Sequence, residues 1–503
     1  PSPETERGVG IQVIRTHLNV SDNNSFSALY KGIDAYHLTN AVRQIHITGN
    51  QFNRTLQNIT LTNGVFAKII DNDFGSVNNN GGAEAWGIFA HNSAGLQIID
   101  NKFNCSASLA DANLDNLGIV LQHSGHYTNV ISDNDFTGAW DYANLFQGDN
   151  SQITIECNTY ADEVWIDWKV HSGVLQNQGK CEDDFIERTR RNSFHTPSPN
   201  NSYNIDFCDT CIAIDGNANQ TANFEYIGQI GFRPTYNNGS VSSDETCLIE
   251  SPHCGFDNEP CAADPDCLQA RILEAETVQE KVYYQTLLLQ AHLEQENDEA
   301  IKQDLIGFDD TEANKMLTGT YESETQIELA WEYLDLVPED TESNIAFKAV
   351  YTDLLNGIAL NGSGKMGNQQ EIVLRANIQI RPESVSSALA QSVIAAYTGE
   401  SFEKVLGIGK NNDAEITATN NNILSIQPNP AQNELHIQVL ETDKMSQNMH
   451  LQIYNLQGQL LQNNKLKTKN TNISLQTLPN GVYFCRLQSG KTLLDTEKLI
   501  IIH

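Results

Sequence analysis

The first 180 residues alternate apolar and polar positions in short runs that are separated by polar turns. Runs such as GLQIIDNKF and GIVLQHS have the two-residue period of a strand, and no helical period competes with them. Several runs end on an asparagine that stands two places before an aromatic residue. This pattern predicts repeated short strands with one asparagine-bearing turn in each repeat.

The repeat contains six copies of this kernel, in SDNNSF, ITGNQF, IIDNDF, IIDNKF, ISDNDF and IECNTY. Their asparagines are 26, 22, 29, 33 and 24 residues apart, which indicates stacked coils with loops of different length. We expect each asparagine to take the left-handed conformation at a tight turn and to bond its amide to that of the next coil. The aromatic residues should stack in a column. The ladder asparagines are Asn24, Asn50, Asn72, Asn101, Asn134 and Asn158.

Stacked coils of this kind describe a parallel β-helix, in which each coil buries its apolar face only against its neighbours. Residues 1–180 resemble the right-handed parallel β-helices of the pectate-lyase-like superfamily. The resemblance implies the fold and two enzyme classes, polysaccharide lyases and glycoside hydrolases. It does not by itself imply an activity, because one fold carries many functions.

The charged residues of the repeat argue against both enzyme classes. A lyase needs a basic residue, often with calcium, and the nine Lys and Arg residues of 1–180 show no two at equivalent positions. A hydrolase needs two carboxyls about 5–9.5 Å apart. The candidate carboxyls are Asp71, Asp73, Asp133, Asp135, Asp141 and Asp167. The pairs Asp71 with Asp73 and Asp133 with Asp135 flank ladder asparagines, and we interpret them as solvated turn residues. We therefore assign no catalytic residue, and a β-helix lyase or hydrolase remains the alternative.

A second column of polar residues lies nine to eleven positions before the kernels, at His91, His123, Asp149 and His171. If the coils are in register, these side chains line one edge and offer ligands for a transition metal. We favour the simpler interpretation of polar turn residues that face water. We predict no metal or other cofactor, with calcium as the one ion left open.

Aromatic residues near the loops that open the coils give a third candidate. Exposed rings stack on sugars, while nearby carboxylates bond sugar hydroxyls. The alternative is that the rings close the loops onto the core. The predicted ligand-binding residues are Trp86, Trp140, Tyr142, Trp165, Trp168, Asp141 and Asp167.

Residues 181–265 interrupt the repeat with a segment that is rich in Cys, Asn, Pro and Asp. The cysteine spacing lacks the second C-x-x-C of a zinc site, so we predict a disulfide-stapled cap on the β-helix in an oxidising compartment. The candidate disulfide cysteines are Cys181, Cys208, Cys211, Cys247, Cys254, Cys261 and Cys267.

Residues 266–407 follow a helical period and predict a small α-helical domain, in which we identify no candidate catalytic or binding residues. A polar linker, 408–422, separates it from the last segment. The expected helices cover 268–297, 325–337, 343–360, 371–380 and 382–399.

Residues 423–503 alternate apolar and polar positions between turns and predict a compact β-sandwich. This segment closely resembles the type A C-terminal sorting domain of the type IX secretion system of Bacteroidota. The resemblance implies export through that machinery to the outer cell surface or the extracellular space, with attachment to surface lipopolysaccharide or release. The matching residues are Pro428, Asn429, Pro430, Gly458, Gly481, Tyr483, Gly490 and Lys498.

The charge of the chain narrows its partners. It has 64 acidic and 30 basic residues, a net charge of −34, which excludes a nucleic-acid partner. No apolar run is long enough to span a membrane, and the opening PSPETERGVG lacks a leader pattern, so we expect a mature or cut form. We expect a secreted or surface-attached, non-enzymatic protein whose rod binds glycans or assembles with copies of itself. A structural subunit of an extracellular fibre or appendage is the second alternative.

Overall fold

The structure is a computed structural model that describes most of the chain. The described residues are 8–175, 192–193, 203–207, four two-residue strands between 222 and 247, 261, 264–404, 406 and 424–501, less gaps at 39–42, 76–83, 106–115, 127, 162, 322, 324, 362–365, 428–430, 440–448, 456–459, 467, 480 and 490–491. The chain divides into two compact units, residues 1–365 with 382–410, and residues 366–381 with 411–503.

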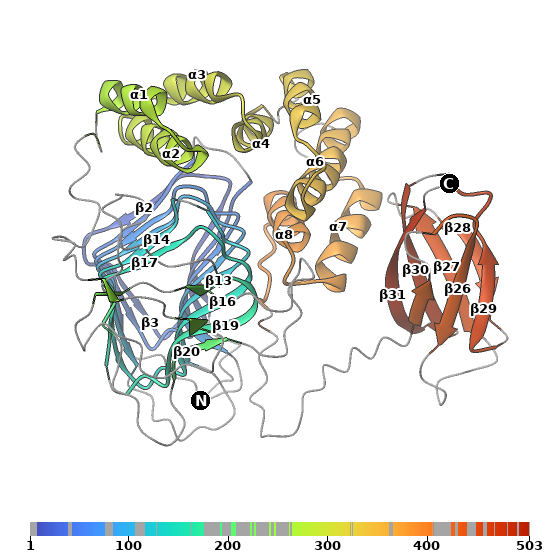
Figure 1. The fold of residues 1–503 in the computed structure, drawn as a ribbon, viewed down its shortest axis with the longest axis horizontal. Helices are drawn as coiled ribbons and strands as arrows, with labels where there is room; N and C mark the ends of the chain where they lie inside the picture. The colour runs from blue at the N-terminus through green and yellow to red at the C-terminus, as the bar shows by residue number, and fades with distance from the viewer. Residues whose placement is uncertain are drawn as a thin grey trace. The chain divides into compact units, whose positions relative to one another are not determined.

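The first unit is built on a parallel β-helix of about five turns, the blue-to-green coils of Figure 1. Each coil gives one strand to each of three parallel sheets. Sheet A contains β1 (Val9–Ile14), β4 (Lys31–Tyr36), β7 (Gln57–Thr62), β10 (Ala85–His91), β13 (Asn116–Gln122), β16 (Tyr142–Asp149), β19 (Ile166–Val174) and β20 (Tyr203–Phe207).

The other two sheets have shorter strands. Sheet B contains β2 (Leu18–Ser21), β5 (Ile45–Thr48), β8 (Lys68–Ile70), β11 (Gln97–Ile99), β14 (Val130–Ser132) and β17 (Thr154–Glu156). Sheet C contains β3 (Ser25–Ser27), β6 (Gln51–Asn53), β9 (Asp73–Gly75), β12 (Lys102–Cys105), β15 (Asp135–Gly138) and β18 (Thr159–Tyr160).

The asparagine ladder runs along the turn between sheets B and C. Each side-chain oxygen accepts from the backbone N–H and the amide of the equivalent asparagine in the preceding coil, as Asn101 Oδ1 does from Asn72 at 3.0 Å for both bonds. The Asn101 amide also donates to two backbone carbonyls, of Ile69 at 2.8 Å and Ile99 at 3.0 Å. One buried side chain therefore satisfies the polar groups of three successive coils.

The left-handed residue is the one before each ladder asparagine, and not the asparagine as we expected. Asp71, Asp100 and Asp133 have φ of 54°, 56° and 56°. The asparagine itself has to aim its amide along the axis, while the residue before it makes the turn. Aspartate and asparagine tolerate this conformation better than most side chains.

The aromatic column fills the interior behind the ladder. Phe26, Phe52, Phe74, Phe103, Phe136 and Tyr160 stack with ring centroids 4.5–5.2 Å apart. Isoleucines from sheets A and B pack around the column to form one continuous core.

The β-helix continues beyond residue 180, where the sequence pattern places its end. Strand β20 extends sheet A, and Asn192 adds a seventh rung whose Oδ1 accepts from Asn158 N at 3.1 Å. The signal was present in the sequence, because Asn192-Ser193-Phe194 repeats the kernel. Phe194 itself lies outside the described residues.

A second, shorter ladder crosses the corner between sheets A and B. The backbone N–H of Gly64, Ser93 and Ser124 donates in turn to Ser93 Oγ, Ser124 Oγ and Asn150 Oδ1, at 3.0–3.1 Å. Its positions hold Gly64, Ser93, Ser124 and Asn150, so no one residue type marks every rung in the sequence.

Beyond the β-helix, two pairs of two-residue strands precede the helices: β21 (Ala222–Asn223) pairs with β23 (Val241–Ser242), and β22 (Tyr226–Ile227) with β24 (Thr246–Cys247). The described helices are α1 (Pro265–Glu274), α2 (Val278–Glu294), α3 (Asp298–Phe308), α4 (Thr311–Thr320), α5 (Ile327–Leu336), α6 (Glu342–Asn361), α7 (Asn368–Ile380) and α8 (Val385–Thr398).

The helix expected over 268–297 is two helices. A capping box at Thr277 and Glu280 starts α2 and so separates it from α1. Helices α3 and α4 were not expected, and each begins at a side-chain cap, Asn297 and Asp310.

The helices of the first unit pack directly on the β-helix. Val65 and Phe66, in a turn of the β-helix, share a core with α2, α3 and α4. Lys68 on β8 pairs with Glu294, and Gln97 on β11 bonds Gln290 at 3.1 Å, so α2 also lies against sheet B. The β-helix and these helices therefore form one unit.

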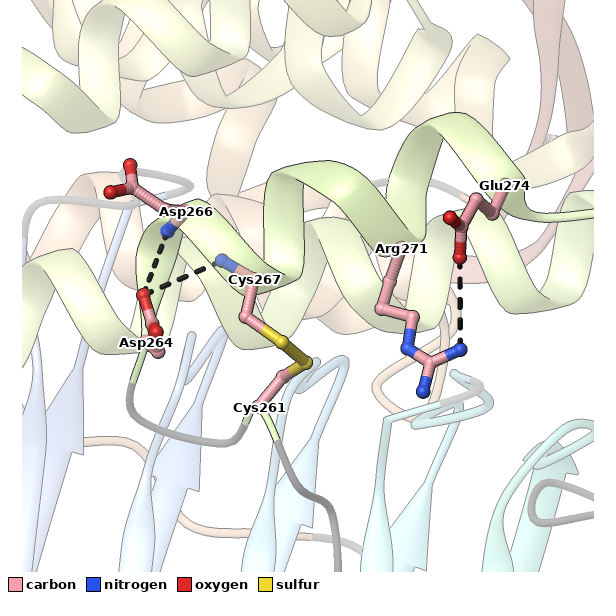
Figure 2. Close-up of a disulfide and its surroundings, with 6 residues drawn as sticks. All are labelled: Cys261, Asp264, Asp266, Cys267, Arg271 and Glu274. Atoms are coloured by element: carbon pink, nitrogen blue, oxygen red, sulfur yellow. Dashed lines mark hydrogen bonds and ion pairs between the residues drawn. A yellow bond between two sulfur atoms is a disulfide. The ribbon is translucent and has the colours of Figure 1, made fainter.

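A disulfide lies at the start of α1 (Figure 2). Cys261 and Cys267, two of the predicted cysteines, are joined with their Cα atoms 5.4 Å apart. Asp264 between them caps the helix by accepting from the N–H groups of Asp266 and Cys267 at 3.1 and 3.4 Å. Cys157 in the β-helix is disulfide-bonded as well. Cys181, Cys208, Cys211, Cys254 and the side chain of Cys247 lie outside the described residues.

The second unit contains two antiparallel sheets around a small apolar core (Figure 1, red). One sheet has the order β25 (Leu424–Gln427), β26 (Glu434–Val439) and β29 (Asn470–Ser474). The other has the order β28 (Leu460–Lys465), β27 (Met449–Asn455), β30 (Gly481–Ser489) and β31 (Thr492–Ile501).

The ladder makes a quantitative prediction. Asn101→Ala removes two accepted and three donated hydrogen bonds at a fully buried site, so we expect a loss of about 3 kcal/mol in the free energy of unfolding. Asn24→Ala at the exposed first rung is the matched control and should cost under about 1 kcal/mol. Urea denaturation followed by tryptophan fluorescence measures both, and equal losses would contradict the ladder's role.

Candidate functional site

The outer face of sheet A is where the first unit gathers its unusual chemistry. Three rows of outward side chains cross the strands in register, and one of them runs Tyr36, Thr62, His91, Gln122 and Gln147. Helix α8 lies over this face, together with residues 400–404 and 406. We call residues 400–404 and 406 the strap. Asn63 beside it donates to Ala388 O at 2.9 Å and Ser392 Oγ at 2.7 Å on α8.

A buried ion pair anchors the strap to β4. Lys31 Nζ lies 3.3 Å from Asp34 Oδ2 and donates to Ser401 Oγ at 3.0 Å and to Phe402 O at 2.9 Å. Ser401 Oγ in turn donates to Asp34 Oδ2. Lys31 and Asp34 are 1% and 0% exposed, so their charges are compensated by each other and by the strap.

Tyr36 completes this anchor. Its Oη accepts from Phe402 N at 2.7 Å, and the two rings meet edge to face at 6.0 Å. Burial raises the pKa of Tyr36 well above its ordinary value, with the Asp34 charge acting in the same direction. Tyr36 therefore stays neutral and holds the strap through its hydrogen bond with Phe402.

Lys404 is the second buried amine of this face. Its Nζ donates to Thr62 Oγ1 and to Gln391 Oε1, both at 2.6 Å, and lies 5.3 Å from the centre of the Tyr36 ring. No carboxylate bonds it among the described residues. The pKa of Lys404 is lowered to about 7, mainly by burial; the charge of Asp34 opposes this shift, that of Lys31 adds to it, and that of Glu403 opposes it.

The expected exposed aromatic platform does not hold for three of its rings, since Trp86, Trp140 and Trp168 are at most 1% exposed. Trp86 does point outward from sheet A, but it is buried in an apolar cluster that Leu406 of the strap joins. Its indole N–H donates to Thr60 Oγ1 at 3.1 Å. These three rings are not available to stack on a sugar.

Trp140 and Trp168 belong to the core of the β-helix. Trp140 packs edge to face on Phe103 at 6.1 Å, and the Trp168 indole donates to Tyr160 Oη at 2.8 Å. Asp141 is nearly buried and its Oδ2 accepts from Asn116 N at 2.8 Å. Asp167 is fully buried.

Two of the predicted ligand-binding rings remain near solvent. Trp165, in the turn between β18 and β19, is 42% exposed, whereas Tyr142 is half-buried against the Trp86 cluster. Their part in ligand binding stays a prediction.

The histidine column is not in register. His91 pairs with Gln122, so His123 stands one position further along its coil, and the two rings are 6.4 Å apart. Asp149 donates its backbone N–H to His123 Nδ1 at 3.4 Å. Among the described residues no three His, Cys, Asp or Glu side chains gather to hold a metal ion.

Sheet C presents an open polar face on another side of the coils. One row of exposed side chains contains Ser25, Gln51, Asp73, Lys102, Asp135 and Thr159 in continuous register. A second row, two residues further along each strand, contains Ser27, Asn53, Gly75, Asn104 and Thr137. Neighbouring members of a row are one strand spacing apart, about 4.8 Å. This regular array was not recognised in the sequence because its residue types vary.

The molecule thus combines a parallel β-helix with an antiparallel domain that lies near the end of the sequence. Residues 425–502 match the family of secretion system C-terminal sorting domains. Such a domain directs export through the type IX secretion machinery, so the protein is extracellular or lies at the cell surface. No curated protein matches the chain. Within the described part of the chain, no helix has the length and apolar character to cross a membrane.

The sorting residues are partly visible. Tyr483 on β30 is buried and donates its Oη to Pro479 O at 2.6 Å, which fixes the turn before the strand. Gly481 begins β30, and Lys498 lies on β31 opposite Phe484. Pro428, Asn429, Pro430, Gly458 and Gly490 lie outside the described residues.

The ion pair under the strap predicts strong coupling between its partners. Lys31→Met leaves the Asp34 carboxylate buried without its cation, so we expect a loss of about 3 kcal/mol in stability, and Asp34→Leu should cost a similar amount. The double variant removes both charges and should lose clearly less than the sum of the two. Urea denaturation of all four proteins closes the cycle, and additive losses would contradict the pairing.

Proposed function

We propose that this protein is a secreted or surface-attached, non-enzymatic rod that binds linear glycans along the exposed face of sheet C. One observation carries the proposal: a row of six exposed polar side chains follows the coil axis in unbroken register across sheet C, beside a second row in which Ser27, Asn53 and Asn104 are exposed. The β-helix keeps these rows rigid, so little side-chain order has to be gained on binding.

The chemistry of the face favours a sugar ligand. Its side chains are hydroxyls, amides, carboxylates and one amine, all of which can bond sugar hydroxyls. None of the row residues is a large apolar one, so the face lacks the anchors on which protein interfaces usually depend. Neighbouring members of a row are about 4.8 Å apart, which is close to the length of one sugar ring, so successive rings of an extended chain meet successive members of a row.

The charges narrow the ligand further. Asp73 and Asp135 flank Lys102 in the first row, and Asp71 and Asp100 are exposed at the adjoining turn. The face is therefore acidic, which favours neutral glycans over polyanionic ones. Trp165, exposed in the turn that follows β18, supplies a ring at the border of this sheet.

The carboxylates considered for hydrolysis support a role in binding without turnover. Asp73 and Asp135 occupy the same row, two strands apart with Lys102 between them, rather than facing each other across a bond. The buried candidate Asp141 accepts a hydrogen bond from the Asn116 N–H. These positions suit structure and recognition better than acid–base work.

The proposal predicts the effect of clearing the second row. Asn53→Ala with Asn104→Ala removes two exposed amides, so we expect the affinity for a soluble neutral glucan, mannan or xylan to fall by about 2 kcal/mol, roughly thirtyfold in Kd. Calorimetric titration of the full chain measures it. Asn356→Ala, an exposed asparagine on α6, is the matched control and should bind as the parent does.

Three outcomes would overturn this function. Products released from any of these glycans would show an enzyme. Equal binding by the variant and the parent would place the site elsewhere. No binding, together with self-association of the chain in sedimentation, would favour a subunit of an extracellular fibre.

A further inference from the structure

The strap closes the outer face of sheet A with groups that come from both ends of the first unit. Tyr30, Lys31, Asp34 and Tyr36 all bond strap residues that lie more than 360 positions later in the chain. The contacts include two main-chain groups of Phe402, so they fix the path of the strap and not only its side chains.

The strap has no regular secondary structure of its own. Residues 400–404 and 406 form neither helix nor strand. Their position therefore depends on their contacts with sheet A, which we call the seam. At the far side of the seam Gln147 donates to Leu406 O, and Leu406 enters the apolar cluster of Trp86, Phe89, Val120 and Leu145. Lifting the strap therefore exposes a coherent apolar surface.

The geometry around Lys404 makes this attachment depend on protons. The amine is held by two neutral oxygens, from Thr62 and Gln391, at 2.6 Å each, and lies over the rings of Tyr36 and Phe89 at 5.3 and 5.9 Å. A neutral amine fits this setting, because the side chain is buried and the two N–H groups of a neutral amine match the two oxygens without a carboxylate. When the strap is lifted, the same amine enters water, where lysine holds its proton up to about pH 10.

The charged and titratable groups that face Lys404 do not remove this dependence of strap attachment on protons. On β4 these are Lys31, paired with Asp34, and Tyr36, whose pKa burial raises well above the ordinary value. On β10 it is His91, whose pKa burial lowers, so that both Tyr36 and His91 are neutral from pH 7 to 10. On the strap itself it is Glu403, which accepts from Tyr30 Oη at 2.6 Å. Helix α8 and β7 contribute the neutral Gln391 and Thr62.

We propose that the strap is a releasable, proton-linked closure of sheet A: docking places Lys404 in its pocket as a neutral amine and gives one proton to the solvent. The sign follows from the two states. Burial lowers the pKa of docked Lys404 to about 7, below that of the free amine. Between about pH 7 and 10 the lifted strap binds one proton more than the docked strap, so docking strengthens as the pH rises. Below about pH 7 both states carry the proton and the dependence ends.

Site-specific lysine labelling tests the proposal on the unmodified full chain. An amine acetylating reagent is applied at pH 7.0, 8.0 and 9.0, and mass spectrometry gives the labelling rates of Lys404 and of Lys281, an exposed lysine on α2. The ratio of the two rates reports the lifted fraction, because both amines have the intrinsic reactivity of lysine when exposed. We expect the ratio to stay well below one and to fall about tenfold from pH 8.0 to 9.0, one proton per docking event.

A second measurement guards against an unrelated cause. Hydrogen exchange of the peptide that covers 399–406, corrected for intrinsic exchange, should show the same pH dependence in the parent and in the matched control Lys281→Met. Lys404→Met retains the length of the stem and should make strap opening independent of pH. A labelling ratio near one would show that the strap is not docked. A constant ratio, or a pH dependence that survives in Lys404→Met, would overturn the proton linkage. Neither readout involves sheet C or a glycan, so this proposal stands or falls apart from the proposed function.

Discussion

The rod depends on one recurring constraint, the need to satisfy buried backbone groups where each coil turns from sheet B to sheet C. The ladder asparagines meet this need with an amide that accepts from the coil before and donates to that coil's strand and to the coil after. Register follows from the ladder, because a slip of one residue would put a polar side chain in the core and an aromatic one at the turn. The aromatic column and the straight rows of sheet C are consequences of that register.

The same register gives the β-helix one face that stays exposed to solvent and one face that has to be covered. Sheet C carries short polar side chains outward and remains open, whereas sheet A carries Trp86, Phe89, Val120 and Leu145 outward and has to be covered. The chain covers it with α8 and the strap. Lys31 and Asp34 then lose their water together, which is tolerable only because each compensates the other and the strap supplies further bonds. An exported protein therefore keeps its apolar sheet hidden while presenting its polar one.

The features that could be predicted from the sequence are those that depend on a short stretch of the chain. The ladder and the aromatic column follow from a three-residue kernel, and the sorting domain from short motifs in a fixed order. The break before α2 was readable in Thr277 and Glu280, and the seventh rung in Asn192, because both signals span four residues or fewer. The burial of Trp86 was not readable, since it depends on Leu406, which belongs to the same cluster but lies far along the chain. Nor could the sequence pair Lys31 with Ser401, or show that the rows of sheet C align.

The span of the strap contacts has a consequence for the order in which the protein folds. Rungs of the ladder join residues 22 to 34 positions apart, whereas Lys31 and Phe402 are 371 positions apart. Coils can therefore stack one after another as a nascent chain grows, but the seam forms only when nearly the whole first unit exists. Until then the aromatic outer face of sheet A is bare. A chain whose synthesis stops before residue 406 would expose this apolar surface. Such a chain is expected to aggregate or to be removed by proteases.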